Sequence, residues 1–216
     1  MVDLRLNAIV DPERANGRSL VDLARAVVAG GATLIQLRDK HGSTRRMIEE
    51  ARAIHAALAG SGVPLVINDR VDVALVAQAD GVHVGQDDMR VEDARRLLGP
   101  DAIIGLSIKS VALADAAPID ALDYVGVGGV YATTSKDSPN PPIGVAGLAA
   151  IVAAFRGRRR DLPICGIAGI DATNAAPVIA AGADGVAVIS ALSMRGDPEA
   201  AARELRAIVD AALRSR

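Results

Sequence analysis

Short apolar runs recur along the whole chain, and polar residues gather where the runs end rather than inside them. Each run has five to seven residues and is rich in Val and Ile, which is the length and composition of a β-strand. The pattern therefore predicts eight strands, over residues 6–10, 33–37, 64–68, 81–85, 103–107, 124–130, 163–167 and 185–189.

The segments between these runs have the spacing of amphipathic helices. Between the first two runs, Leu20, Leu23, Ala24 and Val27 repeat at i, i+3, i+4 and i+7, and Ser19 is placed as an N-cap. Strand and helix alternate eight times without a polar linker, which predicts one parallel α/β domain over residues 1–216. The predicted helices cover residues 20–28, 43–58, 71–78, 91–98, 111–117, 145–155, 174–181 and 198–213.

Alternation alone permits either a closed (β/α)8 TIM barrel or a doubly wound open sheet. The eight repeated units fit the barrel. No GxGxxG sequence follows the first run, as a dinucleotide-binding open sheet would show. The polar residues are spread over most run ends, whereas an open sheet gathers them at one switch point. These observations favour the barrel, whose active site lies at the carboxyl ends of the strands.

Composition narrows the possible functions. Of the 216 residues 50% are hydrophobic but only 1% aromatic, so the core must be aliphatic, and the formal net charge is −2. Such a charge gives no general attraction to nucleic acid or to a membrane surface. The single cysteine, Cys165, lies inside an apolar run and predicts a buried, reduced thiol. No signal-peptide pattern and no apolar stretch of transmembrane length is visible, so we expect a soluble, cytoplasmic protein.

The second run ends in three polar residues of alternating position, Gln36, Arg38 and Lys40. If the strand alternation continues, all three lie on one side and form a receptor for a phosphate or diphosphate. The alternative is a charged strand end in which the cations pair with Asp39.

Oxygen ligands follow the third and fourth runs. Asn68 and Asp69 close the third run, and Asp88 lies shortly after the fourth. Neighbouring strand ends are close enough for both carboxylates to reach one ion, and hard oxygen ligands suit Mg²⁺. His83 lies within a strand and without metal-ligand spacing, which favours a hydrogen-bonded core residue over a ligand.

The last three runs are followed by segments suited to phosphate binding. Gly169 and Ser190 follow the seventh and eighth runs, where barrels commonly bind a phosphate through backbone N–H groups. The polar loop 131–142 follows the sixth run and contains Lys136, which predicts an active-site loop that closes over substrate; the alternative is an ordinary loop lengthened by drift. The basic residues 156–160 lie at the opposite end of the barrel and predict a solvated helix terminus.

Several stretches occur together and in the same order in one known family. They are QLRDK (36–40), IND (67–69), ADGVHVGQDD (79–88), GLS (105–107), DYVGVGGVYATTSK (123–136), GIAGI (166–170) and NAAPVIAAGADGVAVIS (174–190). Over nearly its whole length the chain resembles the thiamine-phosphate synthase family. The resemblance implies a Mg²⁺-using transferase with a (β/α)8 barrel. It would join 4-amino-5-hydroxymethyl-2-methylpyrimidine diphosphate to hydroxyethylthiazole phosphate, releasing diphosphate.

The resemblance also implies roles for particular positions. The diphosphate would leave a pyrimidine methylene cation that the thiazole nitrogen captures, with Arg38, Ser107 and Lys136 stabilising the departing group. Asp69 and Asp88 match the Mg²⁺ ligands. The implied substrate-binding residues are Gln36, Arg38, Lys40, Asn68, Ser107 and Lys136 for the pyrimidine diphosphate, and Thr133, Ser135, Gly169, Ile189 and Ser190 for the thiazole phosphate.

The chain departs from the family at four positions. Lys109 stands where the family usually has His, Ser135 replaces Thr, Gly129 replaces Pro and Ala168 replaces Gly. Lys109 adds a cation near the diphosphate and disfavours the related thiazole tautomerase, which is thought to use the His.

Other functions remain open at this point. A tautomerase would need neither the diphosphate nor the metal ligands, and an epimerase or aldolase would need metal-binding His residues or a buried strand Lys. A non-catalytic sensor of phosphorylated ligands is a further alternative, which the retained carboxylates disfavour. Small phosphorylated molecules are the predicted partners, and the sequence does not indicate an oligomeric state.

Overall fold

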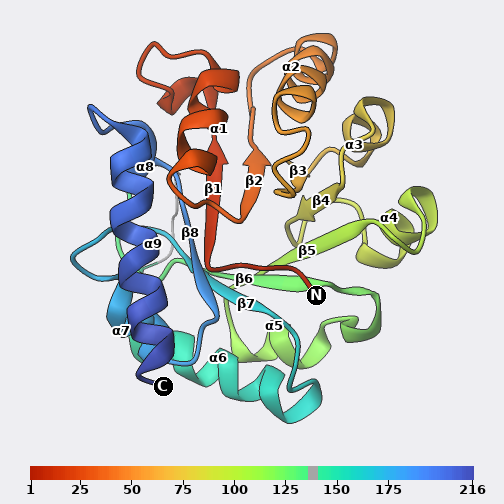
Figure 1. The fold of residues 1–216 in the computed structure, drawn as a ribbon. Helices are drawn as coiled ribbons and strands as arrows, with labels where there is room; N and C mark the ends of the chain where they lie inside the picture. The colour runs from red at the N-terminus through yellow and green to blue at the C-terminus, as the bar shows by residue number, and fades with distance from the viewer. Residues whose placement is uncertain (136–140) are drawn as a thin grey trace.

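The computed structural model describes residues 1–135 and 141–216 and confirms the closed parallel barrel. Each strand pairs in parallel with its sequence neighbours, and β8 closes the barrel against β1. Figure 1 shows the helices lying outside the ring of strands. The strands are β1 (Leu6–Val10), β2 (Leu34–Leu37), β3 (Leu65–Asn68), β4 (Gly81–Val84), β5 (Ile103–Ile108), β6 (Tyr124–Gly128), β7 (Ile164–Ile167) and β8 (Gly185–Val188).

The helices lie where the amphipathic spacing predicts them. Side chains of Ser19, Ser43, Ser110 and Asp197 accept hydrogen bonds from backbone N–H groups at the helix starts, as N-caps do. Three short elements were not predicted: α8 and two 3₁₀ turns, Pro12–Arg14 and Ile119–Ala121. The helices are α1 (Leu20–Ala29), α2 (Thr44–Ala57), α3 (Val71–Ala77), α4 (Val91–Leu98), α5 (Val111–Ala116), α6 (Gly144–Arg158), α7 (Ala175–Ala180), α8 (Ser190–Ser193) and α9 (Pro198–Arg214).

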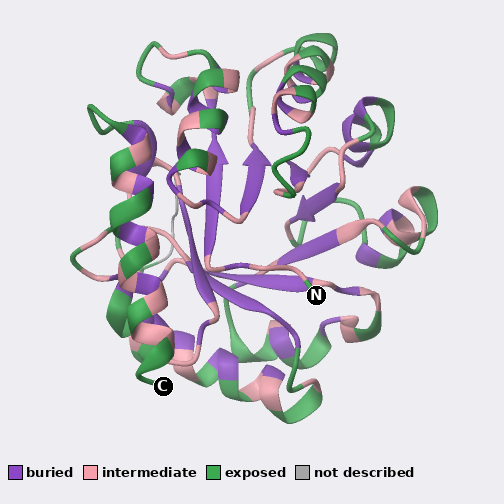
Figure 2. Ribbon diagram, in the orientation of Figure 1, coloured by how far each residue is buried: buried purple, intermediate pink, exposed green. Residues whose placement is uncertain are grey.

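Two hydrophobic cores follow from the alternation of side chains along the strands. In β3, Leu65 and Ile67 pack outward into the large core beneath the helices, whereas Val66 belongs to a smaller cluster inside the barrel. The inner cluster also holds Tyr124 and Cys165, so the prediction of a buried thiol is confirmed. Figure 2 shows buried strands and helices whose outer faces alone are exposed. In the part of the chain that the structure describes, no helix is long and apolar enough to cross a membrane.

One hydrogen-bonding device repeats around the amino-terminal end of the barrel. At the start of each odd-numbered strand, a backbone N–H donates to a side chain that immediately precedes the next strand. The donor–acceptor pairs are Leu6–Thr33 (3.1 Å), Leu65–Asp80 (2.7 Å), Ile104–Asp123 (2.8 Å) and Ile164–Asp184 (2.9 Å). These side chains therefore fix neighbouring strands to each other where the ladder begins.

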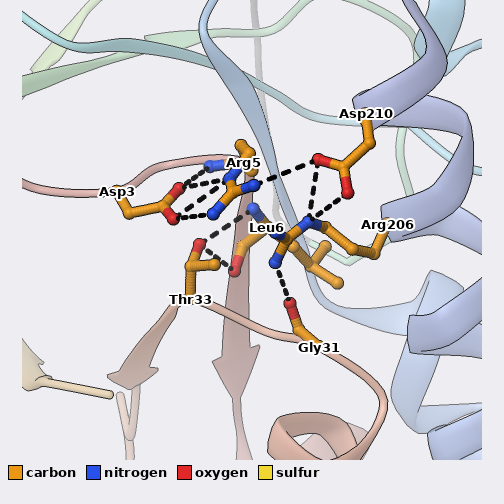
Figure 3. Close-up of polar contacts among 7 residues, drawn as sticks. All are labelled: Asp3, Arg5, Leu6, Gly31, Thr33, Arg206 and Asp210. Carbon is orange, nitrogen blue, oxygen red and sulfur yellow. Dashed lines mark hydrogen bonds and ion pairs between the residues drawn. The ribbon is translucent and has the colours of Figure 1, made fainter. Parts of the chain in front are cut away.

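A basic side chain from the preceding helix completes this device. Arg95 pairs with Asp123 at 2.5 Å, and Arg156 pairs with Asp184 at 2.6 Å. Under β1, Arg206 donates to the Gly31 carbonyl at 2.7 Å (Figure 3).

Residues 156–160 lie at the end of α6 with Arg158 and Arg160 exposed, as the predicted solvated helix terminus requires, but three of these arginines also bind backbone carbonyl oxygens. Besides Arg156, both Arg158 and Arg159 donate to backbone carbonyl oxygens, at the end of α5 and in the segment between α5 and β6. These acceptors are distant in the chain, so the run of charges alone did not reveal them.

Candidate active site at the carboxyl ends of the strands

A cavity of about 860 Å³ opens at the carboxyl ends of the strands. Barrel enzymes carry out their chemistry at this end. A second hollow of about 580 Å³ lies near the other ends of β3 and β4, against Pro64 and Asp80, away from the predicted site residues. The predicted residues that line the larger cavity are Gln36, Arg38, Asn68, Ser107, Thr133, Ser135, Gly169, Ile189 and Ser190.

Arg38 is held in the cavity mouth by a carboxylate that the sequence reasoning missed. Its guanidinium makes an ion pair with Asp11, whose side chain is 1% exposed. Asp11 also accepts a hydrogen bond from the Glu13 backbone N–H at 2.9 Å, as N-cap of a 3₁₀ turn. A guanidinium held on one side by a fixed carboxylate keeps its remaining N–H donors for a ligand. The turn signal at Asp11-Pro12 was visible in the sequence, but its role toward Arg38 was not.

Lys40 lies outside the cavity wall, which differs from the predicted alternation of Gln36, Arg38 and Lys40. The strand β2 ends at Leu37, and Asp39 accepts the backbone N–H groups of His41 and Gly42, so the chain turns there. Lys40 instead makes an ion pair with Asp69.

Asp69 and Asp88 lie together at the rim, as the metal prediction requires. Partial burial, followed by the neighbouring Asp69 carboxyl, raises the pKa of the Asp88 carboxyl. Asp88 also accepts the Gly85 backbone N–H at 2.7 Å. Two carboxylates in contact, with one ammonium beside them, form a pocket of negative charge suited to a cation. Among the described residues, no group of three or more His, Cys, Asp or Glu side chains forms a closed metal cage.

The backbone at Asp69 is held in an unusual conformation. Its φ is +64°, in the left-handed region, and its N–H donates to the His83 carbonyl at 2.7 Å. Asp tolerates this region better than most residues, but it remains strained. The twist separates Asn68, which lines the cavity, from Asp69, which faces Lys40.

Ser107 lines the cavity and is fixed through both its backbone and its side chain. Its carbonyl accepts from the Gln86 amide at 2.7 Å, and its Oγ is 2.9 Å from His83 Nε2. The other ring nitrogen of His83 contacts Tyr124 at 2.9 Å. The prediction that His83 is a hydrogen-bonded core residue is therefore confirmed, although the ring also lines the cavity.

The loops after β6, β7 and β8 meet on the far wall of the cavity. Ser135 Oγ donates to Ser190 Oγ at 3.1 Å, and the Ser135 N–H donates to Thr133 Oγ1 at 3.1 Å. Ser190 is also the first residue of α8. Thr133, Ser135 and Ser190 thus place three hydroxyl groups together, as a phosphate site requires.

Glycine is needed at position 169 for two reasons. Its φ is +64°, and an added Cβ would lie 2.3 Å from the Ala132 carbonyl oxygen. The preceding residue, Ala168, also has a positive φ of +87°. These two residues with positive φ bring the β7 loop against the β6 loop, where the Tyr131 N–H donates to the Ala168 carbonyl at 3.0 Å.

Two lysines that the sequence analysis singled out remain to be placed. Lys109 lines the cavity, so the departure from the family at this position lies in the site itself. Lys136, predicted to contact the diphosphate, lies outside the described residues, as does the central part of the predicted closing loop.

A (β/α)8 barrel whose mouth cavity is lined by basic groups (Arg38, Lys109 and Arg195) and by hydroxyl groups, with a carboxylate pair at the strand ends, defines an enzyme for anionic substrates. The family model described as thiamine monophosphate synthase matches residues 6–192. The chain belongs to this family and is an enzyme of the transferase class, as the sequence predicts.

Individual relatives agree with this assignment over their full lengths. The chain is 52% identical to the thiamine-phosphate synthase of Agrobacterium fabrum, over 100% of this chain and 98% of that protein. It is 49% identical to that of Chloroflexus aurantiacus, over 97% and 94% respectively. Its structure is similar to a thiamine phosphate pyrophosphorylase from Pyrococcus furiosus, with a TM-score of 0.84, 36% identity and 98% coverage of both chains.

Proposed function

We propose that the chain condenses 4-amino-5-hydroxymethyl-2-methylpyrimidine diphosphate with hydroxyethylthiazole phosphate to give thiamine phosphate and diphosphate. The observation that carries this proposal is that anion-binding groups line one cavity from two parts of the strand ring. Arg38 and Ser107 come from the β2–β5 side, and the Ser135–Ser190 pair comes from the β6–β8 side. A joining reaction between two phosphorylated molecules needs such an arrangement, because each phosphate must be held while the reacting atoms meet between them.

On the first side, the residues suit a leaving diphosphate. Arg38 offers N–H donors held in place by Asp11, and Lys40 lies at the rim beside Asp69. Gln36 and Asn68, from the ends of β2 and β3, also line the cavity. Donors fixed before the reaction stabilise a group whose negative charge grows as its bond to carbon breaks. The proposed role of Lys136 is of the same kind.

The carboxylate pair fits Mg²⁺. Partial burial first, and then the neighbouring Asp69 carboxyl, raise the pKa of Asp88, and a divalent cation would offset both effects on the ionised form. Mg²⁺ is usually held by one or two carboxylates together with substrate phosphates and waters, which suits the absence of a larger ligand cluster among the described residues. Asp69 and Asp88 would hold the Mg²⁺, which would supply positive charge to offset the negative charge of the departing diphosphate.

On the second side, the residues suit a phosphate monoester. Thr133, Ser135 and Ser190 supply hydroxyl donors, and the Gly169 and Ile189 backbone lies beside them. We propose that they hold the thiazole phosphate so that the ring nitrogen faces the pyrimidine methylene carbon. The chain's contribution to bond formation is then orientation.

The proposed reaction uses no nucleophile from the protein. Burial raises the pKa of the Cys165 thiol to about 12, so it stays protonated inside the barrel. The chemistry then depends on how readily the diphosphate leaves, and water must be kept from the reactive cation. The apolar part of the cavity, which includes Ile9, Ile167 and Ile189, favours that exclusion.

The test is incubation of the purified chain with both substrates and Mg²⁺, with thiamine phosphate and diphosphate measured by chromatography. We expect both products in equal amounts and loss of turnover in excess chelator. Omission of either substrate should abolish product. Turnover of a thiazole isomer without the pyrimidine substrate would indicate the tautomerase instead. Cytoplasmic location remains a prediction, to be tested by cell fractionation.

A further inference from the structure

A line of three polar side chains leads from the inside of the barrel to the cavity. The Tyr124 hydroxyl is 2.9 Å from His83 Nδ1, and His83 Nε2 is 2.9 Å from Ser107 Oγ. Tyr124 is 0% exposed and His83 is 8% exposed. Ser107 lines the cavity, so a buried tyrosine is connected through one histidine to a residue of the proposed site.

Two strand glycines make the space for this line. Gly105 lies in register with His83 on one side and Tyr124 on the other. A Cβ added at Gly105 would lie 2.2 Å from Tyr124 Cζ and 2.6 Å from His83 Nδ1. A Cβ at Gly126 would lie 3.1 Å from His83 Cε1. Glycine weakens a strand interior, so its presence at both places indicates that the histidine and tyrosine rings need the room.

The directions of the hydrogen bonds follow from the tyrosine. Among the described residues, the Tyr124 hydroxyl meets no acceptor other than His83 Nδ1. Burial raises the pKa of Tyr124 well above its usual value, so the phenol keeps its proton. The hydroxyl therefore donates to Nδ1, because the opposite direction would leave its hydrogen without an acceptor in the core. A neutral imidazole that accepts at Nδ1 carries its hydrogen on Nε2, which then donates to Ser107 Oγ.

This direction decides what Ser107 presents to a ligand. With its oxygen accepting from His83, the serine hydrogen is available to the cavity. In the other tautomer the serine would donate to the ring and turn only lone pairs toward the cavity, where an anion would be repelled. The Gln86 amide, 2.7 Å from the Ser107 carbonyl, fixes the backbone of the same residue.

We propose that Tyr124 and His83 are positioning residues that hold Ser107 as a hydrogen-bond donor to an anionic oxygen of the pyrimidine diphosphate. The proposal rests on the proposed function for the identity of the anion. It adds two residues, from β4 and β6, that act on the substrate through Ser107.

The first test is a double-mutant cycle of Tyr124→Phe and Ser107→Ala, measured by synthase activity. Tyr124→Phe keeps the ring and removes only the hydroxyl, and its folding is checked by thermal unfolding. We expect Tyr124→Phe alone to lower kcat/KM for the pyrimidine diphosphate by about 10- to 10²-fold, the usual effect of losing a residue that orients a ligand-contacting group. The KM for the thiazole phosphate should stay the same.

The Ser107→Ala background separates positioning from general stability. If Tyr124 acts through Ser107, adding Tyr124→Phe to Ser107→Ala should change activity by less than about 2-fold. An undiminished second loss would overturn the proposal. His83→Gln, which keeps an amide N–H to offer Ser107, should retain more activity than His83→Ala, and equal losses would also contradict it.

The second test needs no activity. In ¹⁵N spectra of the wild-type protein, the neutral His83 ring should carry its hydrogen on Nε2 and none on Nδ1. The chain has 3 histidines, and His41→Gln and His55→Gln variants identify the His83 signals by elimination. A hydrogen on Nδ1 would overturn the relay. Absence of synthase turnover in the wild type would refute the proposed function, whereas this spectrum would still decide the hydrogen-bond direction.

Discussion

The two ends of this barrel treat charge in opposite ways. At the amino-terminal end, acids and bases are matched and tied to backbone groups, as in the Asp3–Arg5–Asp210–Arg206 network of Figure 3. At the carboxyl end, Asp69 and Asp88 contact each other, and Asp69 and Ala168 have positive φ values. The first arrangement lowers the energy of the free chain, whereas the second is complete only when a ligand arrives.

The carboxyl groups show the same contrast in their pKa values. Burial opposes ionisation of Asp3, but hydrogen bonds from Arg5 outweigh it and lower the pKa of that carboxyl. Partial burial and the neighbouring Asp69 raise the pKa of Asp88. The amino-terminal end therefore stabilises the ionised form of Asp3. The carboxyl end keeps Asp88, whose ionised form a cation would stabilise. We expect substitutions at the amino-terminal end to change stability and substitutions at the carboxyl end to change activity.

The largest expected effect is the loss of activity in Asp69→Asn. Asn also tolerates a left-handed φ, so the backbone should keep its conformation. Loss of one carboxylate from the proposed Mg²⁺ site should lower kcat by on the order of 10²-fold or more, the scale of one important electrostatic contact. Steady-state kinetics with both substrates measures this.

Asp87→Asn is the matched control for this substitution, because Asp87 is an exposed neighbour of Asp88. It should leave kcat within about 2-fold of wild type, the effect expected of a surface change. If Asp69→Asn keeps full turnover, the metal assignment is wrong.

At the other end, Asp123→Ala should destabilise the fold and leave the chemistry alone. It removes the charged partner of Arg95, which keeps its backbone carbonyl acceptors, and the acceptor of the Ile104 N–H. Loss of the ion pair together with an unpaired, partly buried N–H should cost about 2–3 kcal/mol of unfolding free energy. Urea unfolding measures the loss, and kcat should be unchanged.

Asp101→Ala provides the comparison, because this exposed carboxylate lies just before the same strand, β5. Its effect should stay within about 0.5 kcal/mol. If the two variants were equally stable, the repeated device would contribute nothing to the fold, and the contrast between the two ends would fail.

The sequence predicted the barrel because its eight strand-like runs and the helix spacings point to the same fold. It also placed Gln36, Arg38, Asn68, Ser107 and Ser190 on one cavity, because parallel strands end on one side. Lys40 was misplaced because alternation stops where β2 ends at Leu37. Nothing in local spacing shows that a strand has ended before a charged residue.

Other features depend on partners distant in the chain. Asp11 and Arg38 are joined only when β1 and β2 pair, and the roles of Gly105 and Gly126 require the positions of His83 and Tyr124. The amino-terminal device left a trace that could have been found. Aligning the even-numbered strands places Thr33, Asp80, Asp123 and Asp184 at the same position, directly before each strand.

A smaller effect on activity is expected at Asp11, which shares features with the structural carboxylates of one barrel end and with the site carboxylates of the other. It is buried like a structural acid, but its partner Arg38 lines the cavity. Asp11→Asn should weaken the hold on the guanidinium and raise KM for the pyrimidine diphosphate by roughly 10-fold, equivalent to ~1.4 kcal/mol. The KM for the thiazole phosphate should be nearly unchanged. A lower KM for the diphosphate would show instead that Asp11 competes with substrate for Arg38.

The smallest expected effect is a pair of opposite changes in thermal stability. A carboxyl whose pKa is raised in the folded state destabilises that state once it ionises, above its unfolded value near 3.8. Removing it with Asp88→Asn should therefore raise Tm at pH 7 without Mg²⁺ by about 1–3 °C. Asp3 has a lowered pKa, so its stabilisation is present above its unfolded value and is lost as pH falls. Asp3→Asn should lower Tm at pH 7 by a similar amount.

The Tm differences of Asp88→Asn and Asp3→Asn from the wild type should depend on pH, and that of Asp88→Asn should also depend on Mg²⁺. Both differences should shrink in acid, as the wild-type carboxyls become protonated. Mg²⁺ should raise the Tm of the wild type but not that of Asp88→Asn, so that added metal removes the advantage of the variant. Scanning calorimetry at pH 7 and pH 4, with and without Mg²⁺, measures all of these changes. If Asp88→Asn lowered Tm in metal-free buffer, the carboxylate pair would be structural, and the two ends of the barrel would not differ as described.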